Sequence, residues 1–333
     1  MRLERLAFDH PELHEFLKDH STSIFDQAEW SRVLKEGFDS EVVFYCLREN
    51  GRIVMALPGI ILNFKILRMF YSNIPYGGFL GNMENFSLFL DILEETLKKD
   101  HIHFIRVSKN FQTSFPELKG YSKDTAYTHL LDLDQMTEES IWANYKKRVR
   151  RDIRKAEKSG ITIHEAKEPQ EIDLLFDLYV ETMKRNKAYN TWSRKALHAI
   201  DQHLVKKEEA KILLAKRKDE VIAGIILIFS PRTIYYFFAA SAPQHLSLCP
   251  NDLLVHHGIC LAIREGRKLF DLMASQKEDV ALMNFKEKWG AQKYPFYFYE
   301  KSLNFPRTWL WRKVWWMMST SAGAHVLRWW RGR

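Results

Sequence analysis

The sequence has few cysteines and no apolar run long enough to span a bilayer. Its three cysteines, Cys46, Cys249 and Cys260, stand far apart and form no CxxC pair. This spacing indicates neither a zinc site nor a disulfide framework, and it favours a reducing compartment. The longest apolar runs, such as residues 221–229, fall well short of the ~20 residues that a membrane-spanning helix needs. We therefore expect no transmembrane helix.

Motifs of secretion, metal catalysis and serine hydrolysis are also missing. The first residues, MRLERLAFDHPELHEF, carry acids and histidines where a signal peptide has an apolar core, so secretion is not expected. The chain contains neither HExxH nor GxSxG. Its paired histidines, at 101 and 103 and at 256 and 257, form no recognised metal-binding pattern. No metal site is predicted.

The chain is long enough for two domains and is strongly basic. Its 333 residues exceed one ordinary core and match two domains of about 150 residues each. Hydrophobic residues make up 46% and charged residues 28%, a composition typical of folded proteins. The formal charge of +8 indicates a polyanionic partner, which is RNA, a nucleotide diphosphate or an anionic membrane. Charge alone does not choose among these three.

The first half has the order strand, strand, helix, strand. Residues 41–62 read EVVFYCLRENGRIVMALPGIIL, and Asn50 with Gly51 supplies the positive backbone dihedrals of a tight hairpin turn. After a loop that reads IPYGGFLGN, the pattern predicts a helix over 85–99 and an apolar strand over 101–108.

The second half repeats this order. Residues 211–229 predict a hairpin, followed by a strand over 233–241, a helix over 251–266 and a strand over 268–273. Sequence identity between the halves is slight, so we infer a repeated architecture and not a solenoid repeat. The pattern predicts an α/β (α+β) fold in which the halves are structural duplicates with mixed sheets.

A strongly basic amphipathic helix is expected between the halves. Thr137 with Ser140 offers an N-terminal cap, and Gly160 offers the end of the helix. Apolar residues at three- and four-residue spacing form one buried stripe. The cations of the helix are Lys146, Lys147, Arg148, Arg150, Arg151, Arg154, Lys155 and Lys158. This face is either a solvated charged surface or a surface that binds RNA or phosphate.

A lysine lies beside aromatic residues near the end of the second half. The segment FKEKWGAQ, residues 285–292, follows the strand FDLM and the polar stretch ASQKED. Acyl transfer develops negative charge on the carbonyl oxygen, and a fixed cation stabilises that transition state. Lys286 is a candidate for this cation. Taken alone, the pattern fits better with Phe285 and Trp289 in the core and Lys286 reaching solvent.

Several segments of the second half resemble the Fem family of N-acyltransferases. They are RRDIRKAEKSGITI, LFDLYVETMKRNKAY, IYYFFAAS, PNDLL, FDLM and FKEKWGAQ, in that order. The first half resembles the family more loosely, through SIFDQAEWSRVLK and IPYGGFLG. The resemblance implies two tandem acetyltransferase-like (GNAT) domains, which we place at 1–136 and 137–304. A C-terminal segment over 305–333 follows them.

The resemblance also implies roles for particular residues. Phe285 and Lys286 resemble the Phe-Lys pair that lies beside the aminoacyl end of the donor, where the lysine helps to hold charge during transfer. Arg185 and Tyr189 resemble the arginine and tyrosine that grip the diphosphate-bearing acceptor, a role that suits the forked donors of arginine. Within the basic helix, we assign RNA or phosphate binding to Lys147, Arg150, Arg151 and Arg154.

Other positions match the family less closely. Tyr76 and Tyr236 resemble further acceptor contacts, and Lys35 resembles the acceptor lysine of the first domain. Where the family often has an acid after the glycine loop, this chain has Gly81 and Asn82. No general base is therefore assigned, and an amine nucleophile near neutral pH can lose its proton to the leaving oxygen or to water.

The loop that grips CoA in acetyltransferases is missing. Those enzymes hold the pyrophosphate on backbone N–H groups of an [R/Q]xxGx[G/A] loop at a helix N-terminus. The corresponding segment here reads HLSLCPNDLL and has no glycine. We therefore expect aminoacyl-tRNA as the donor and no bound cofactor. An acyl-CoA donor that acylates an amino sugar of a surface polysaccharide or a lipid stays open, as does a non-catalytic RNA- or membrane-binding role.

The C-terminal segment concentrates tryptophan and arginine. Residues 305–333 hold six of the ten tryptophans, and no acid occurs after Glu300. Such a segment either lies flat on an anionic membrane or docks on the core, and we favour the membrane. Together with the resemblance to the Fem family, which implies an N-acyltransferase, these features predict a cytoplasmic enzyme at the inner face of the membrane. It would transfer an amino acid from aminoacyl-tRNA to an amine of a lipid-linked or UDP-linked peptidoglycan precursor.

Overall fold

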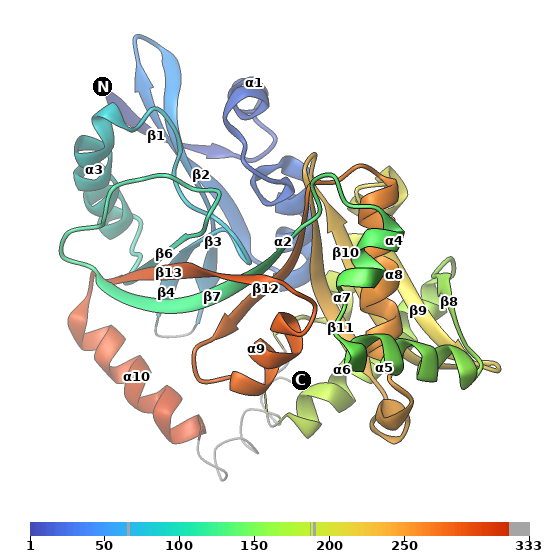
Figure 1. Ribbon diagram of the computed structural model, residues 1–333. Helices are drawn as coiled ribbons and strands as arrows, with labels where there is room; N and C mark the ends of the chain where they lie inside the picture. Colours follow the sequence, from blue (N-terminus) through green and yellow to red (C-terminus); the bar gives the residue numbers. More distant parts are fainter. Residues whose placement is uncertain (65–66, 187, 189–190, 320–333) are drawn as a thin grey trace. The chain divides into compact units, whose positions relative to one another are not determined.

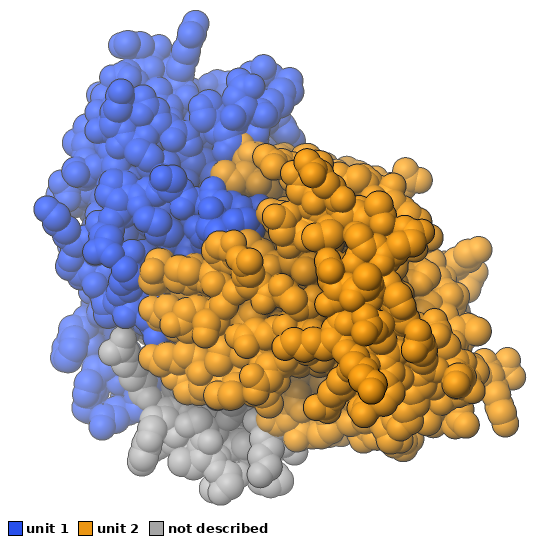
Figure 2. Space-filling view, viewed as in Figure 1, with its two compact units in different colours: residues 1–20, 40–124, 298–333 blue, residues 21–39, 125–297 orange. Residues whose placement is uncertain are grey.

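The computed structural model describes residues 1–333 except 65–66, 187, 189–190 and 320–333. The chain forms two compact units, which Figure 2 colours separately. Unit 1 consists of Met1–His20, Ser40–Asp124 and Phe298–Arg333, and unit 2 consists of Ser21–Asp39 and Thr125–Tyr297. The units are interleaved along the chain, whereas the domains expected from the sequence are contiguous stretches.

Unit 1 is built on a sheet with the strand order β1-β2-β3-β4-β6 (Figure 1). Neighbouring strands are antiparallel except β4 and β6, which are parallel. The elements are β1 (Arg2–Ala7), α1 (Pro11–His20), β2 (Glu41–Glu49), β3 (Arg52–Asn63), β4 (Arg68–Ser72), β5 (Leu80–Gly81), η2 (Met83–Asn85), α3 (Phe86–Lys99), β6 (Phe104–Lys109) and α10 (Phe305–Ser319). β7 (Ser122–Asp132) and β13 (Gln292–Ser302) each have residues in both units.

The predicted hairpin and helix of the first half are confirmed. Asn50 and Gly51 have φ values of 49° and 81°, and they join β2 to β3. Two consecutive positive φ values suit the right-handed twist of a hairpin, which explains asparagine followed by glycine. No element was predicted over 68–72, where the structure forms the strand β4.

Unit 2 has the strand order β12-β11-β10-β9-β8. Its strands are β8 (Ile161–Glu165), β9 (Ala210–Arg217), β10 (Glu220–Phe229), β11 (Thr233–Ser241) and β12 (Leu269–Gln276). Its helices are η1 (Ile24–Asp26), α2 (Ala28–Phe38), α4 (Glu138–Asn144), α5 (Lys147–Lys158), α6 (Pro169–Arg185), α7 (Arg194–His203), η3 (Val205–Lys207), η4 (Pro243–Leu248), α8 (Pro250–Arg264) and α9 (Val280–Glu287).

Both units contain the same succession of elements. In unit 1, the antiparallel strands β2, β3 and β4 lead through α3 to β6, which is parallel to β4. In unit 2, the antiparallel strands β9, β10 and β11 lead through α8 to β12, which is parallel to β11. Each sheet is therefore mixed, and the predicted structural duplication is confirmed.

The basic segment forms two helices and not the single helix expected from the sequence. Thr137 and Ser140 form the predicted capping box at the start of α4, and Gly160 follows α5 with a φ of 74°. The helix is interrupted at Tyr145, whose φ and ψ are −62° and 138°. Arg150 Nη1 donates hydrogen bonds to the carbonyl oxygens of Trp142 (3.3 Å) and Ala143 (2.8 Å) near the end of α4. The Trp142 carbonyl also accepts from the Tyr145 N–H at 3.3 Å, so the guanidinium adds a second donor there and supplies one to the Ala143 carbonyl at the break.

The helix α2 belongs to unit 2 because it packs closely on α7. A Cβ atom at Gly37 would lie 2.6 Å from Cβ of Ala196, so only glycine allows this approach. Trp30 on α2 is fully buried, and its ring lies 5.3 Å from the ring of Phe237. Lys35 is exposed in the last turn of α2. It therefore lies in unit 2, whereas the sequence suggested a lysine of the first domain.

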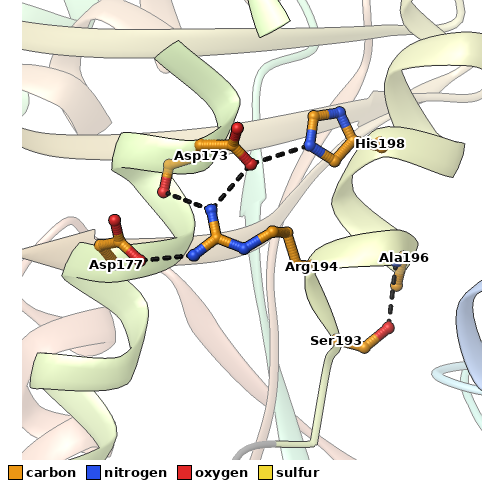
Figure 3. A network of polar contacts seen from close by, with 6 residues as sticks. All are labelled: Asp173, Asp177, Ser193, Arg194, Ala196 and His198. Carbon is orange, nitrogen blue, oxygen red and sulfur yellow. Dashed lines mark hydrogen bonds and ion pairs between the residues drawn. The ribbon is translucent and has the colours of Figure 1, made fainter. Parts of the chain in front are cut away.

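A polar network joins α6 to α7 on the surface of unit 2 (Figure 3). Arg194 donates hydrogen bonds to Oδ1 of Asp173 at 2.7 Å and to Oδ1 of Asp177 at 2.6 Å. His198 Nε2 lies 2.9 Å from the same oxygen of Asp173. Ser193 caps α7 by accepting a hydrogen bond from the backbone N–H of Ala196 at 3.1 Å. These contacts fix the start of α7 against α6.

Candidate active site

The parallel strands β11 and β12 separate after a short paired stretch. Thr233–Tyr235 pairs with Leu269–Asp271, and the described part of the chain shows no further pairing between the two strands. Beyond these residues, β11 continues beside β10, while β12 continues beside β7 after a register shift between Asp271 and Ala274. Met273 adopts a φ of 65° within this irregularity, which is uncommon for a residue with a side chain. The carboxyl halves of β11 and β12 are thus separate from one another.

Lys286 is buried against the irregular part of β12. Its side chain lies in the last turn of α9 and is 3% exposed. The ammonium donates hydrogen bonds to Ser275 Oγ at 2.7 Å, to the Met273 carbonyl at 2.9 Å and to the Ala274 carbonyl at 3.2 Å. Burial lowers the pKa of Lys286 to about 8, although the Asp271 charge opposes the effect. The expectation that Lys286 reaches solvent is therefore wrong.

Two further buried polar residues lie beside Lys286, and sequence reasoning missed both. Asp271 is fully buried, and its Oδ1 accepts hydrogen bonds from Thr128 Oγ1 and from the Met273 N–H, both at 2.7 Å. His129 is also fully buried, and burial together with the Lys286 charge lowers the pKa of its ring to about 4. The ring is therefore neutral near pH 7. The signals in the sequence that could have found them were an acidic residue and a histidine inside otherwise apolar strands.

Phe285 makes apolar contacts next to Lys286. Its ring is partly buried, lies 6.5 Å from the ring of Trp289 and packs against the main core of unit 2. The ammonium of Lys288 lies 4.3 Å from the centre of the same ring. Phe285 thus fixes the position of α9 beside β12, and no polar atom of its own is available for chemistry.

Arg185 lies at the carboxyl end of β11. Its Nη1 donates a hydrogen bond to the Ser241 carbonyl at 3.0 Å, and Thr182 Oγ1 accepts one from the Ser241 N–H at 3.1 Å. Ser241 is the last residue of β11, so Arg185 marks the end of one of the two separating strands. Tyr189, expected beside it, lies outside the described residues.

The two other candidate tyrosines, Tyr236 and Tyr76, are buried. Tyr236 on β11 is 9% exposed, and burial raises the pKa of its phenol, as does the Asp252 charge. Tyr76 is 1% exposed and lies in unit 1. The structure therefore brings Phe285 and Lys286 together at β12 and places Tyr236 on the neighbouring strand, while Tyr76 belongs to a different unit.

The start of α8 differs from a phosphate-binding helix terminus. Cys249 precedes it with a φ of 61°, and Pro250, the first helical residue, has no backbone N–H. Asp252 occupies the first turn, is 7% exposed and forms an ion pair with Lys288. Burial raises the pKa of Asp252, and Lys288 opposes that rise. A carboxylate here disfavours a second anion at the same helix end.

A basic face lies on α4 and α5. The described residues that line it are Trp142, Lys147, Arg148, Arg150, Arg151, Arg154, Lys155, Lys158 and Ser159. Arg154 lies 5.4 Å over the ring of Trp142, and Arg151 pairs with Asp152 at 3.0 Å. α5 packs against both α8 and η4. The basic face therefore lies on a helix that packs against the two helical segments that follow β11, η4 and α8.

Residues 143–287 match the family model of the acetyltransferase (GNAT) domain. Unit 2 holds a GNAT domain. The matched stretch runs from the end of α4 to the end of α9 and contains both separating strands. No curated protein matches the sequence.

Solved structures extend the likeness to the whole chain. FemX is 14% identical, with a TM-score of 0.66 over 93% of this chain and 99% of its own. A tandem GNAT protein from the clavulanic acid biosynthesis pathway, determined without AcCoA, is 11% identical, with a TM-score of 0.61 over 91% of this chain and 99% of its own. L-PGS from Bacillus licheniformis is 12% identical, with a TM-score of 0.55 over 87% of this chain and 91% of its own. The predicted tandem GNAT fold and its resemblance to the Fem type are confirmed.

Most candidate residues lie inside the GNAT domain. Arg185, Tyr236, Phe285, Lys286 and the cations of α5 fall within the matched stretch, whereas Tyr76 and Lys35 fall outside it. Among the described residues, no three His, Cys, Asp or Glu side chains are grouped as a metal site requires. No helix in the described part of the chain is both long and apolar enough to cross a bilayer. The GNAT domain carries an acyltransferase fold.

Proposed function

We propose that the protein transfers an aminoacyl group from aminoacyl-tRNA to an amine of a peptidoglycan precursor, which is lipid-linked or UDP-linked. The observation that carries the proposal is the packing of α5 against α8 in the GNAT domain. α5, which carries the basic face, packs against α8, whose N-terminus has a proline and a buried carboxylate. This arrangement favours a donor whose phosphates are spread along a helix over one held by a single pyrophosphate.

The donor argument rests on how each ligand is bound. An RNA stem presents phosphates at regular spacing, and a row of arginine and lysine side chains on one helix face can contact several of them. Trp142 adds an aromatic surface beneath Arg154. A CoA pyrophosphate needs several backbone N–H groups at one helix start, where this chain has Pro250 and Asp252.

Transfer requires one bond to form and one to break. The acceptor amine attacks the ester carbonyl of the aminoacyl group, the carbonyl oxygen becomes an oxyanion, and the ribose oxygen leaves with a proton that the amine supplies. Lys286 contributes a buried positive charge near the separating strands, and with a pKa of about 8 it is mostly protonated at neutral pH. All three of its donors have protein partners, so it acts on the oxyanion as a fixed charge.

The acceptor residues are proposed from the Fem resemblance. One nitrogen of Arg185 holds the end of β11, and its other N–H groups remain suited to a diphosphate. Tyr189, Tyr76, Tyr236 and Lys35 complete the proposed set. A lipid-linked acceptor would place the reaction at the cytoplasmic face of the membrane.

A donor assay tests the proposal. The full chain is incubated with a pool of charged tRNAs and, separately, with acyl-CoAs, each with membrane extract, and products are identified by mass. We expect aminoacylated precursor from charged tRNA and none from acyl-CoA. Turnover with CoA thioesters alone would replace the donor with acyl-CoA, as in the alternative that the GNAT family model supports. Binding of RNA or membranes without transfer from any donor would indicate a non-catalytic protein.

Charge substitutions on α5 test the RNA surface. Arg151→Gln and Arg154→Gln should each weaken tRNA binding and reduce the slope of log affinity against log salt by about 0.7 to 0.9 for each phosphate that is no longer neutralised. Lys195→Gln, an exposed cation on α7, is the matched control and should leave the slope unchanged. Equal slopes in all variants would place the RNA elsewhere.

A further inference from the structure

A basic pocket lies in unit 1 where α10 begins. It has a volume of about 480 Å³ and is lined by Lys98, His101, Ile102, His103, Leu303, Asn304 and Arg307. None of these lining residues is acidic, and four carry or can carry positive charge. We propose that this pocket binds the phosphate of an anionic phospholipid headgroup while α10 rests on the membrane surface.

Two hydrogen-bond donors face each other in the pocket. The backbone N–H of Arg68 donates to Nδ1 of His103 at 3.0 Å, so Nδ1 is an acceptor and the ring proton lies on Nε2. Nε2 lies 3.1 Å from Nη1 of Arg307, and a guanidinium has donors only. His103 is 7% exposed, so water has little access to its ring. A phosphate oxygen that accepts from both nitrogens removes the conflict.

The charge around His103 suits the same ligand. Burial lowers the pKa of the ring, and Arg307 lowers it further, so neutral histidine with a proton on Nε2 is favoured. Lys98 and His101 are exposed at the end of α3 and complete the wall of the pocket. The facing donors of His103 and Arg307, with no carboxylate among the lining residues, match a phosphate monoanion.

The neighbouring surface of α10 exposes large apolar side chains. Phe305, Trp309 and Leu310 are 71%, 51% and 45% exposed. Phe305 and Trp309 lie one turn apart on the same side of α10 (the red helix in Figure 1), and Leu310 follows Trp309. The exposed Lys313 lies one turn after Trp309, with its ammonium 5.7 Å from the Trp309 ring.

The opposite side of α10 is anchored to unit 1. Thr308 is 3% exposed, and its hydroxyl donates to the Asn304 carbonyl at 2.7 Å and contacts the His103 carbonyl at 3.3 Å. Trp311 lies 4.5 Å from the ring of Phe64. Because these contacts fix the helix, its large apolar side chains are held in water.

The basic pocket and the exposed apolar side chains of α10 together point to an anionic lipid as the ligand. Aromatic and aliphatic side chains on a fixed helix insert into the boundary between headgroups and acyl chains, and adjacent cations attract anionic lipids. Arg307 and Phe305 both belong to the first turn of α10, so the pocket and the exposed side chains share the same end of the helix. This surface is independent of the proposed donor, so vesicle binding can succeed or fail without changing transfer to soluble acceptors.

Vesicle binding by the full chain tests the proposal. The protein is mixed with vesicles of phosphatidylcholine alone and of phosphatidylcholine with phosphatidylglycerol, and the bound fraction is measured by sedimentation. We expect Arg307→Gln to weaken binding to the anionic vesicles about fivefold, because one cation near the surface contributes that factor. Trp309→Ala should weaken it on the order of tenfold.

Matched controls remove similar groups elsewhere in unit 1. Lys119→Gln removes an exposed cation outside the pocket, and Leu88→Ala removes a side chain that is 43% exposed on α3. Both should bind as the wild type does. Equal binding by Arg307→Gln, Trp309→Ala and wild type would refute the proposal.

A direct probe of His103 separates the lipid from free phosphate. Soluble dihexanoyl phosphatidylglycerol should shift the side-chain nitrogen signals of labelled His103, and the shift should be absent in Arg307→Gln. Inorganic phosphate should act much more weakly, since it lacks the acyl chains that α10 contacts. An equal shift with inorganic phosphate, together with vesicle binding that neither Arg307→Gln nor Trp309→Ala weakens, would assign the pocket to a free anion and overturn the lipid proposal.

Discussion

Replacing Lys286 with methionine should change how stability depends on pH. In the folded protein, burial lowers the pKa of Lys286 from 10.5 to about 8. Between these values the unfolded chain binds more protons than the folded one, so the free energy of unfolding rises with pH. The gap between 10.5 and about 8 corresponds to about 3 kcal/mol at about 1.4 kcal/mol per unit. At neutral pH the folded protein is less stable by this amount, and the free energy of unfolding increases by it as the pH rises from about 8 to 10.5.

The measurement is urea unfolding followed by tryptophan fluorescence at two pH values. From about pH 7.5 to about pH 9.5, the wild type should gain about 2 kcal/mol relative to Lys286→Met. The substitution also removes the hydrogen bonds to Met273, Ala274 and Ser275, but that loss is the same at both pH values and cancels in the comparison. Lys195→Met, which removes an exposed lysine, should follow the wild type. An identical pH slope for wild type and Lys286→Met would refute the description of Lys286 as a buried charge.

Two further predictions concern helix packing in unit 2. Gly37→Ala should lower the free energy of unfolding by about 2 kcal/mol, because the new methyl group meets the backbone and Cβ of Ala196. Gly258→Ala meets only side-chain atoms at 3.3 Å and should cost less, so the reverse order in thermal melts would contradict the α2 and α7 packing. Asp173→Asn should cost no more than about 1 kcal/mol at neutral pH, since the ion pair is exposed. Arg194 holds the pKa of Asp173 low, so this difference is fully present above about pH 4 and fades as the pH falls below it.

Local features of the fold could be predicted because their causes lie within a few residues. Asn50 with Gly51 set the hairpin turn, and Thr137 with Ser140 set the start of α4. The break at Tyr145 could not be predicted, because Arg150 stabilises it by reaching back to carbonyls that an unbroken helix would not expose. The burial of Lys286 was missed for a similar reason. Its three acceptors come from the irregular part of β12, whose backbone geometry leaves no pattern in the side chains.

The candidate site was predicted in part. The Fem resemblance singled out Lys286 and Arg185, which lie at the two separating strands. Asp271 and His129 were not singled out, because an isolated acid or histidine in an apolar strand is as easily a satisfied core residue. Their role depends on which strands become neighbours, and a single sequence does not contain that information.

The interleaving of the two units has a consequence for how the chain is made. Ser21–Asp39 leaves the ribosome long before Thr125–Tyr297, yet both belong to unit 2. During synthesis, the apolar face of α2 must wait for the surface of α7, so Trp30 and its neighbours stay exposed until most of the chain has emerged. Late pairing of distant segments slows folding and extends the period in which aggregation competes. A fragment that begins at Thr125 would lack α2, so unit 2 should not be obtainable as one contiguous piece.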